Sequence, residues 1–308
     1  CLLRACESVH RDVNVRTVEA VDRIGETDDS DMLVIRTGPA DADAAPIGQV
    51  SELAGQAAFD YLEAAIGSAQ AGCLDAIVTA PINKESIRLA GHDFPGHTEI
   101  LADRCDTQDF AMMLYVPPGQ QVGGEIGIGV VHTTLHQSLR SALDALSTQQ
   151  IFSKCKLAHD FAAACLNQLG VARSPKIAVA ALNPHAGENG LFGDEEARII
   201  APAVAQARAA GVDCQGPISC DTLMGRAVAG EFDMVVAMYH DQGHIALKLL
   251  GMHKAVNVTL GLPIVRTSVA HGTAFEIAGT GKADPTSLIR AVEVAKQLAR
   301  QKNARIRV

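Results

Sequence analysis

Histidines follow three apolar runs of this sequence, each at a point where a buried strand is expected to end. The runs and the histidines behind them are 126–131 with His132 and His136, 177–182 with His185, and 234–238 with His240 and His244. Imidazole is a common ligand of zinc and similar divalent ions, and a site with three protein ligands leaves room for a substrate. A single histidine is more often structural, but three such positions predict one convergent site.

Four polar residues at or near these strand ends are candidates for a supporting role. They are His132, His244, Asp241 and Glu188. A metal-bound imidazole usually donates its second N–H to a carboxylate or a carbonyl, so each of the four is a candidate for a supporting hydrogen bond. An ordinary structural role is the simpler interpretation of each.

A second group of residues is suited to binding an anion. It consists of Lys84, His97, Thr98, Lys248, Asn257 and Arg266. Solvated surface charge is the usual explanation for such residues. However, Lys248, Asn257 and Arg266 interrupt apolar surroundings, and a buried cation is costly unless it meets an anion. We therefore expect a small substrate that carries phosphate or carboxylate.

A third segment, 270–284, is rich in glycine. Glycine lets the backbone approach a ligand closely, but the spacing does not match the dinucleotide-binding pattern GxGxxG. On spacing alone the segment is a weak indication of a binding loop.

The elements that must position these residues alternate along the chain. Buried strands are predicted at 73–80, 126–131, 177–182 and 234–238, and helices at 52–69, 150–169, 194–210 and 285–300. Alternating strands and helices indicate an α/β fold with mostly parallel strands, which binds ligands beyond the carboxyl ends of the strands. No internal repeat or linker is recognisable, so two lobes would have to form by crossing of the chain.

Composition limits the function classes. The 308 residues are 48% hydrophobic and carry a net charge of -9, which argues against a general nucleic-acid surface. No apolar run approaches the roughly 20 residues of a membrane span, and no signal peptide is recognisable, so a cytoplasmic location is expected. The eight cysteines form no CxxC pair and are expected to be reduced and mostly buried. A catalytic thiol is the alternative, although no motif would lower its pKa.

Several motifs together resemble one family. They are Gly96-His-Thr-Glu, Leu182-Asn-Pro-His-Ala-Gly-Glu, Asp221-Thr-Leu, Ala237-Met-Tyr-His-Asp-Gln-Gly, Val256-Asn-Val-Thr-Leu-Gly-Leu-Pro, Arg266-Thr-Ser and His271-Gly-Thr-Ala. From about Gln56 to the carboxyl end the chain resembles the 4-hydroxythreonine-4-phosphate dehydrogenases, metal-dependent NAD enzymes of pyridoxal phosphate biosynthesis. Their relatives act on four-carbon sugar-acid phosphates.

The resemblance implies a set of site residues. The metal ligands would be His136, His185 and His240, with the third supplied by a partner subunit, so that a homodimer shares the metal site. His97, Thr98, Lys248, Asn257 and Arg266 would bind substrate. Lys84, Asp221 and Asp241 are the candidates for moving protons. The cofactor candidates are His271, Gly272, Thr273 and Ala274.

It also implies an isocitrate/isopropylmalate dehydrogenase-like fold with two α/β/α lobes and a cleft between them. The first lobe would comprise 1–92 plus 268–308, with the cofactor loop at 271–284. The second lobe, 93–267, would carry the metal site and the dimer interface.

The implied reaction is oxidation of the 3-hydroxyl of a four-carbon 4-phosphorylated hydroxy acid, followed by decarboxylation. The substrate would be 4-phosphooxy-L-threonine, D-threonate 4-phosphate or D-erythronate 4-phosphate. NAD is the expected cofactor, with NADP as the alternative, and the metal would be zinc, or else magnesium, manganese or cobalt. The rival interpretations are a dihydrodiol carboxylate dehydrogenase of the same fold, a non-catalytic sugar-acid-phosphate-binding protein, and a zinc hydrolase or aldolase.

Three features depart from the family pattern. The chain begins at Cys1 with a predicted helix and lacks the family's opening strand and Gly-Asp-Pro turn, so it is expected to be truncated. Ala270 stands where many members have aspartate. His132, His244 and Lys248-Leu-Leu-Gly resemble the catabolic branch that acts on D-threonate or D-erythronate 4-phosphate.

Overall fold

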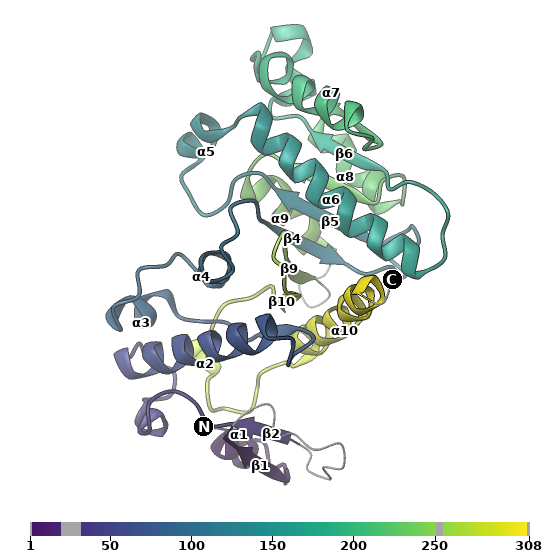
Figure 1. Ribbon diagram of the computed structural model, residues 1–308. Coiled ribbons are helices and arrows are strands. Elements are labelled where there is room, and N and C mark those ends of the chain that lie inside the picture. Colours follow the sequence, from purple (N-terminus) through teal and green to yellow (C-terminus); the bar gives the residue numbers. More distant parts are fainter. Residues whose placement is uncertain (1, 20–31, 251–254, 307–308) are drawn as a thin grey trace.

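An eight-stranded sheet forms the centre of the computed structural model, which describes residues 2–19, 32–250 and 255–306 (Figure 1). In spatial order its strands are β3 (Ile77–Thr79), β10 (Arg266–Val269), β9 (Val256–Leu260), β4 (Ala111–Val116), β5 (Ile128–His132), β8 (Met234–Ala237), β6 (Ile177–Ala180) and β7 (Cys214–Ile218). A separate two-stranded parallel sheet pairs β1 (Val15–Val18) with β2 (Met32–Ile35).

The helices surround this sheet. They are α1 (Leu2–Ser8), α2 (Glu52–Gln70), α3 (Lys84–Leu89), α4 (His97–Arg104), α5 (Leu139–Ala145), α6 (Thr148–Gln168), α7 (Ala201–Ala209), α8 (Cys220–Val228), α9 (His240–Leu249) and α10 (Thr286–Ile306), with the short turns η2 (Ala42–Ala44), η3 (Pro184–Gly190), η4 (Glu196–Ile200) and η5 (Phe275–Ile277). Serine side chains cap the two long helices α2 and α6, because Ser51 accepts from the N–H of Ala54 and Ser147 from that of Gln150. All four predicted strands and all four predicted helices are present, so the α/β class is confirmed.

Strand direction divides the sheet into two parts. β5, β8, β6 and β7 pair in parallel, as predicted. The pairs β5–β4, β4–β9 and β9–β10 are antiparallel, which corrects the prediction of a mostly parallel sheet for this region. The short connection 261–265 explains part of the difference, because a connection this short joins antiparallel but not parallel neighbours.

One row of residues crosses the middle of the sheet. Arg266 on β10 is opposite Thr259 on β9, Thr259 is opposite Met112 on β4, and His132 on β5 is opposite Ala237 on β8. Met113 pairs with Val131, so the residues beside them, Met112 and His132, lie opposite each other as well. The row therefore runs without a break from Arg266 to His132. Side chains directly opposite each other share a face of the sheet, so Arg266 and His132 point to the same side.

Separate apolar cores cover the two faces. Side chains of α6, α7 and α10 pack on one face with Val131, Val179 and Val236. Those of α8 and α9 pack on the other face with Val130 and Val235, and this is the face of His132 and Arg266. A third core joins α2, α3 and α4 to β3, and its α4 residues belong to the predicted second lobe. The lobe boundaries themselves remain a prediction.

The seven described cysteines are all free, as expected, but they are not mostly buried. Cys155, Cys165 and Cys214 are buried within the core beneath α6, whereas Cys73 is exposed where the chain leaves α2. The others, Cys6, Cys105 and Cys220, are half-buried, and Cys1 lies outside the described residues. Among the described helices, none combines the length and the apolar composition that a bilayer-spanning helix needs.

Candidate active site

Four histidines gather at the carboxyl ends of β5 and β8. His132 ends β5, His240 begins α9 directly after β8, and both strands point the same way. The ring centres of His136 and His240 are 5.7 Å apart, and His240 stacks on His244 at 3.8 Å. The structure therefore brings together four of the five histidines that the sequence placed at strand ends.

His185 takes a different position. It lies on η3, and its ring neighbours that of Phe192 at 6.3 Å. Within residues 2–19, 32–250 and 255–306, no three His, Cys, Asp or Glu side chains are arranged to hold a metal ion. The predicted trio His136, His185 and His240 thus does not close into one site inside a single chain.

Hydrogen bonds fix the protonation of the two buried histidines. Nδ1 of His132 lies 3.3 Å from the carbonyl oxygen of Met112, which can only accept, so this nitrogen is the donor. Nε2 of His132 then accepts from Nδ1 of His244 at 3.0 Å. Burial lowers the pKa of His132 to about 4 and that of His244 to about 3, so both rings are neutral at pH 7 and Nε2 is the unprotonated nitrogen of His244.

Gly243 makes this arrangement possible. A Cβ at this position would lie 2.7 Å from Nε2 of His132 and 2.5 Å from Cγ1 of Val130. Any larger residue would therefore push α9 away from β5 and separate His244 from His132.

The turn that carries His185 is strained. His185, Ala186, Glu188 and Asn189 all have left-handed backbone angles, with φ between 43° and 56°, and Gly187 between them has φ 77°. Each non-glycine residue in that region costs roughly 1–2 kcal/mol, so neighbouring contacts must hold the turn. Glu188, proposed as a supporting carboxylate, is exposed on this turn. Asp221 accepts from Ser219 at 2.7 Å, and this bond, together with the nearby His185, lowers the pKa of its carboxyl.

Arg266 forms an incomplete cationic site. Its side chain is buried, and it donates to Oγ1 of Thr259 at 3.0 Å and to Oγ1 of Thr79 at 2.8 Å. Among the described residues its Nε has no hydrogen-bond partner. Oδ1 of Asn257 is likewise buried and unpaired. Burial lowers the pKa of Arg266 to about 10, against a smaller opposing effect of Glu99.

Two helix starts surround this cation. His97 and the buried Thr98 begin α4, and burial with the nearby Arg266 charge lowers the pKa of His97 to about 3. Lys84 begins α3, where the side chain of Asn83 caps the helix by accepting from the N–H of Ser86. Burial, and next the charge of Lys84, lower the pKa of His136, so Lys84 lies within electrostatic reach of His136.

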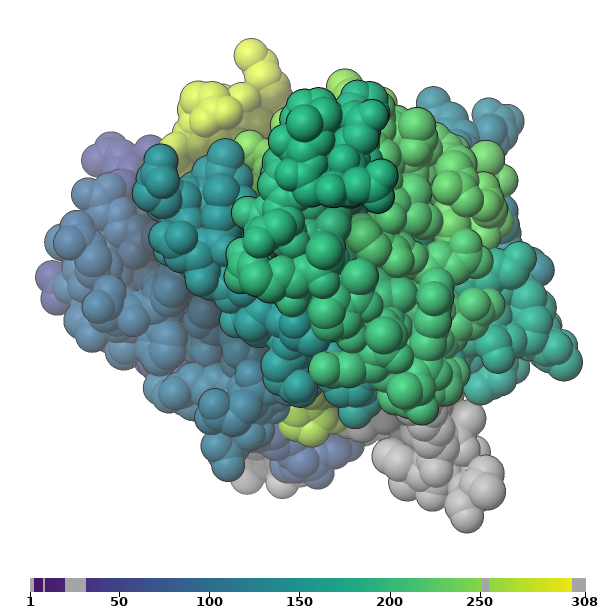
Figure 2. Space-filling model, turned by 90° about the horizontal axis from the view of Figure 1, so that it is seen from above, coloured from purple at the N-terminus to yellow at the C-terminus, as the bar shows by residue number. Residues whose placement is uncertain are grey.

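A hollow of about 530 Å³ opens beside Lys84. It is lined by Lys84, Glu85, Arg88, Asp93, Phe94 and Pro95. Seen from above, the surface is hollowed where the blue part of the chain meets the teal and green part (Figure 2).

Helix α9 contributes two more predicted residues. Oδ1 of Asp241 lies 2.7 Å from Nδ1 of His240, which is the supporting contact expected for a metal-binding imidazole. Lys248 is half-buried on the same helix, and its charge is among the smaller causes that lower the pKa of His244. The last residue of the Lys248-Leu-Leu-Gly motif lies outside the described residues.

The predicted cofactor loop is open to solvent. His271 and Gly272 are exposed, and a Cβ at Gly272 would meet no atom within 4 Å. Ala274 has a left-handed φ of 47° and leads into η5, against which Gly48 packs closely. The backbone at Gly272 is thus free for a ligand to approach.

Sequence patterns did not single out Gln242. It is buried, accepts from the N–H of Met238 at 2.7 Å and donates to the carbonyl of Ala181 at 2.6 Å. It therefore joins the ends of β8 and β6, beside the histidines. The feature of the sequence that could have identified Gln242 is its position between His240 and His244.

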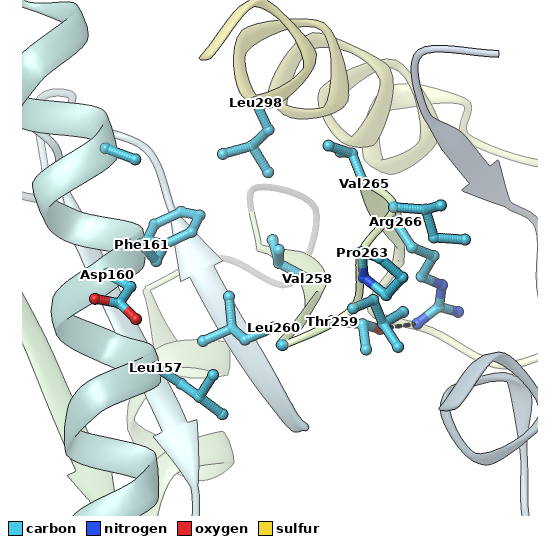
Figure 3. A pocket seen from close by; sticks show the side chains of 14 residues that line it. Leu157, Asp160, Phe161, Val258, Thr259, Leu260, Pro263, Val265, Arg266 and Leu298 are labelled. Carbon is cyan, nitrogen blue, oxygen red and sulfur yellow. Dashed lines mark hydrogen bonds between the residues drawn. The ribbon is translucent and has the colours of Figure 1, made fainter. Parts of the chain in front are cut away.

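A second cavity of about 370 Å³ lies on the opposite face of the sheet. Leu157 and Phe161 of α6, Leu298 of α10 and the 258–266 hairpin line it. Figure 3 shows the Arg266 guanidinium turned away from Phe161 and Leu298, toward Thr259. Arg266 and Thr259 are among the residues that line this cavity, although the guanidinium itself points toward the other side.

Comparisons with known proteins agree with these observations. A family model described as "Pyridoxal phosphate biosynthetic protein PdxA" matches residues 2–295. D-threonate 4-phosphate dehydrogenase of Salmonella typhimurium is 48% identical over 260 residues, covering 84% of this chain and 75% of that protein. 4-hydroxythreonine-4-phosphate dehydrogenase of Beijerinckia indica is 47% identical over 286 residues, covering 93% and 80%.

Solved structures give the same result. A crystal structure of 4-hydroxythreonine-4-phosphate dehydrogenase from Klebsiella pneumoniae superposes with a TM-score of 0.81 at 43% identity, covering 97% of this chain and 87% of that one. A terephthalate 1,2-cis-dihydrodiol dehydrogenase from Burkholderia xenovorans gives 0.61 at 31% identity, covering 92% and 82%.

Proposed function

Because this chain belongs to the PdxA family of pyridoxal phosphate biosynthetic proteins, we propose that it oxidises a short phosphorylated hydroxy acid with NAD and a divalent metal. The family and the dehydrogenase class, both predicted from the motifs, are confirmed by the matches to named dehydrogenases. The rival dihydrodiol dehydrogenase is less similar in sequence and in structure.

The observation that carries the proposal is the buried Arg266, whose Nε has no hydrogen-bond partner among the described residues. A guanidinium this deeply buried is normally matched by a carboxylate, yet its described partners are two threonine hydroxyls. With Asn257, His97 and Thr98 beside it, the guanidinium is suited to bind the phosphate or the carboxylate of a substrate, since charge-assisted hydrogen bonds to such groups are strong.

The histidines fit a divalent metal in part. His136 and His240 offer two imidazole nitrogens on one edge of the sheet, and Asp241 already engages the other nitrogen of His240. Imidazole ligands suit zinc, and also cobalt or manganese. We propose that His185 belongs to the same set and that the set is completed across two chains.

Two chains meeting at α9 would account for its exposed apolar residues. Ile245 and Leu249 are 59% and 82% exposed, and Leu191 on the loop after η3 is 70% exposed. The resemblance assigns His240 to the partner subunit. In this structure His136 and His240 lie together in one chain, so we propose that the partner subunit supplies His185 instead.

The bound metal would lower the pKa of a substrate alcohol, and the nicotinamide would accept the hydride. His271, Gly272, Thr273 and Ala274 would hold the cofactor on the open loop. Arg266 would orient the substrate by one anionic end, and Lys248 would bind the other end. Lys84 lies close enough to His136 to influence its pKa, and in its neutral form, after giving up its own proton, it would take the alcohol proton. Asp221 and Asp241 are engaged by Ser219 and His240, which leaves them as less direct proton carriers.

The test is NADH formation with D-threonate 4-phosphate, D-erythronate 4-phosphate and 4-phosphooxy-L-threonine, each offered separately. Chelator-treated protein is assayed before and after zinc is restored, and NADP is compared with NAD. Zinc-restored turnover of one compound supports the proposal and identifies the substrate. Binding without turnover would favour a binding protein, and cofactor-independent turnover would favour a hydrolase or an aldolase.

A further inference from the structure

The buried side chain of Glu196 is 6% exposed and lies at the start of the π-helical turn η4. Its Oε1 accepts from the backbone N–H of Leu182 at 2.8 Å and from that of Asn183 at 2.7 Å. Its Oε2 accepts from Nδ2 of Asn183 at 3.0 Å. One carboxylate therefore satisfies three donors at the end of β6.

Glu196 also touches the far side of the strained turn. A Cβ on Gly187 would lie 2.8 Å from Oε2 of Glu196 and 3.2 Å from the carbonyl oxygen of Gly193. Asn183 precedes His185 by two residues and Gly187 follows it by two. The contacts of Glu196 thus bracket the histidine on both sides.

Ionisation of this carboxyl is maintained despite its surroundings. Burial opposes the charge, but hydrogen bonds from Asn183 and Leu182 outweigh burial, so the pKa of Glu196 lies below its usual value. The π-helical turn is supported separately, because Thr148 donates to the carbonyl of Ile199 at 3.1 Å. The carboxylate is therefore a fixed anchor for the turn beside it.

We propose that Glu196 is a positioning residue that holds the left-handed turn around His185 and thereby orients its imidazole toward the metal. This inference rests on the proposed function, in which His185 is a metal ligand. Residues behind a metal ligand that fix its orientation typically contribute ten- to a hundredfold in metal affinity. A turn with left-handed angles at Ala186, Glu188 and Asn189 would relax without such an anchor.

The experiment measures zinc affinity of the full chain by competition with a chromophoric chelator, in the absence of substrate and cofactor. Glu196→Ala should weaken zinc binding about ten- to a hundredfold. Glu196→Gln should retain most of the affinity, because its amide oxygen can still accept from both backbone N–H groups. Glu196→Asp keeps the charge but withdraws the oxygens, so a clear loss is expected.

Asp233→Asn is the matched control. Asp233 is also a buried carboxylate that accepts a backbone N–H, from Lys176 at 2.8 Å, but it lies at the opposite end of the strands. This variant should lower the melting temperature and leave zinc affinity unchanged.

The outcomes separate the two proposals. If the unsubstituted protein binds no zinc, the proposed function fails. If it binds zinc and the Glu196→Ala and Glu196→Asp variants bind equally well, the positioning role is overturned. If Glu196→Ala does not fold, the Glu196→Asp affinity decides alone.

Discussion

Replacing Arg266 by methionine should weaken catalysis and at the same time stabilise the free protein. Methionine fills a similar volume without the charge. The guanidinium is 3% exposed, and burial lowers its pKa to about 10, more than two pH units below an ordinary arginine. At about 1.4 kcal/mol per pH unit, the buried charge costs on the order of 3 kcal/mol.

Losing the two bonds to Thr79 and Thr259 offsets part of this gain. Each is worth about 1 kcal/mol, so a net stabilisation of about 1 kcal/mol remains, or a rise of about 2 °C in melting temperature. A bound anion would lose two charge-assisted hydrogen bonds of about 1.5–3 kcal/mol each, so kcat/KM should fall about 10²- to 10⁴-fold.

The assay pairs thermal unfolding with NADH formation, and Arg173→Met serves as the control. Arg173 pairs with Asp233 at 2.7 Å and with Glu125 at 2.6 Å, far along the sheet from Arg266. Its loss leaves the buried Asp233 carboxylate without its ion-pair partner, so the protein should be destabilised by about 3 kcal/mol or more while kcat/KM is unchanged. The reasoning is refuted if Arg266→Met lowers the melting temperature as the control does and leaves kcat/KM intact.

Three further predictions follow from the histidines and from Gly243. Below pH 6.5 the unfolded chain binds protons that His132 and His244 cannot take when folded, so the free energy of unfolding should be greatest above pH 6.5 and should fall toward pH 4, measurable by urea titration. A slope unaffected by His132→Gln would contradict this. Mixing inactive His136→Ala and His185→Ala proteins should restore part of the activity if the metal site is shared between chains, whereas no recovery would indicate a site within one chain. Gly243→Ala should lower activity strongly, because the added Cβ has no room beside His132, and unchanged kcat would refute that steric argument.

Much of the fold and the polar site was predictable because local signals agreed. The apolar runs before His132, Pro184 and Tyr239 all became buried strands, and their parallel pairing placed histidines at one edge. Arg266 and Asn257 interrupted apolar surroundings, and each proved to carry a buried polar atom without a hydrogen-bond partner in the described part of the chain. A polar residue inside an apolar segment can be recognised from a short stretch of sequence, so its burial can be predicted.

Other features depend on contacts between residues far apart in the sequence, which a short stretch of sequence cannot reveal. The antiparallel pairing of β4 with β9 joins segments more than a hundred residues apart. The left-handed turn at His185 depends on Glu196, and the hydrogen bond between His132 and His244 depends on the bare backbone of Gly243. The separation of His185 from His136 could not be predicted either, because it depends on how η3 folds away from the end of β6.

The row of residues from Arg266 to His132 has a length that the sheet fixes. Three strand spacings of about 4.8 Å separate β10 from β5 along that row, or about 14 Å between backbones. The side chains at both ends shorten this span to a gap suited to a small molecule. Since backbone hydrogen bonds set the spacing, the distance between the anion-binding end and the histidine end is a property of the sheet. If Arg266 binds one end of the substrate as proposed, the rigid sheet would set the length of the substrate that fits.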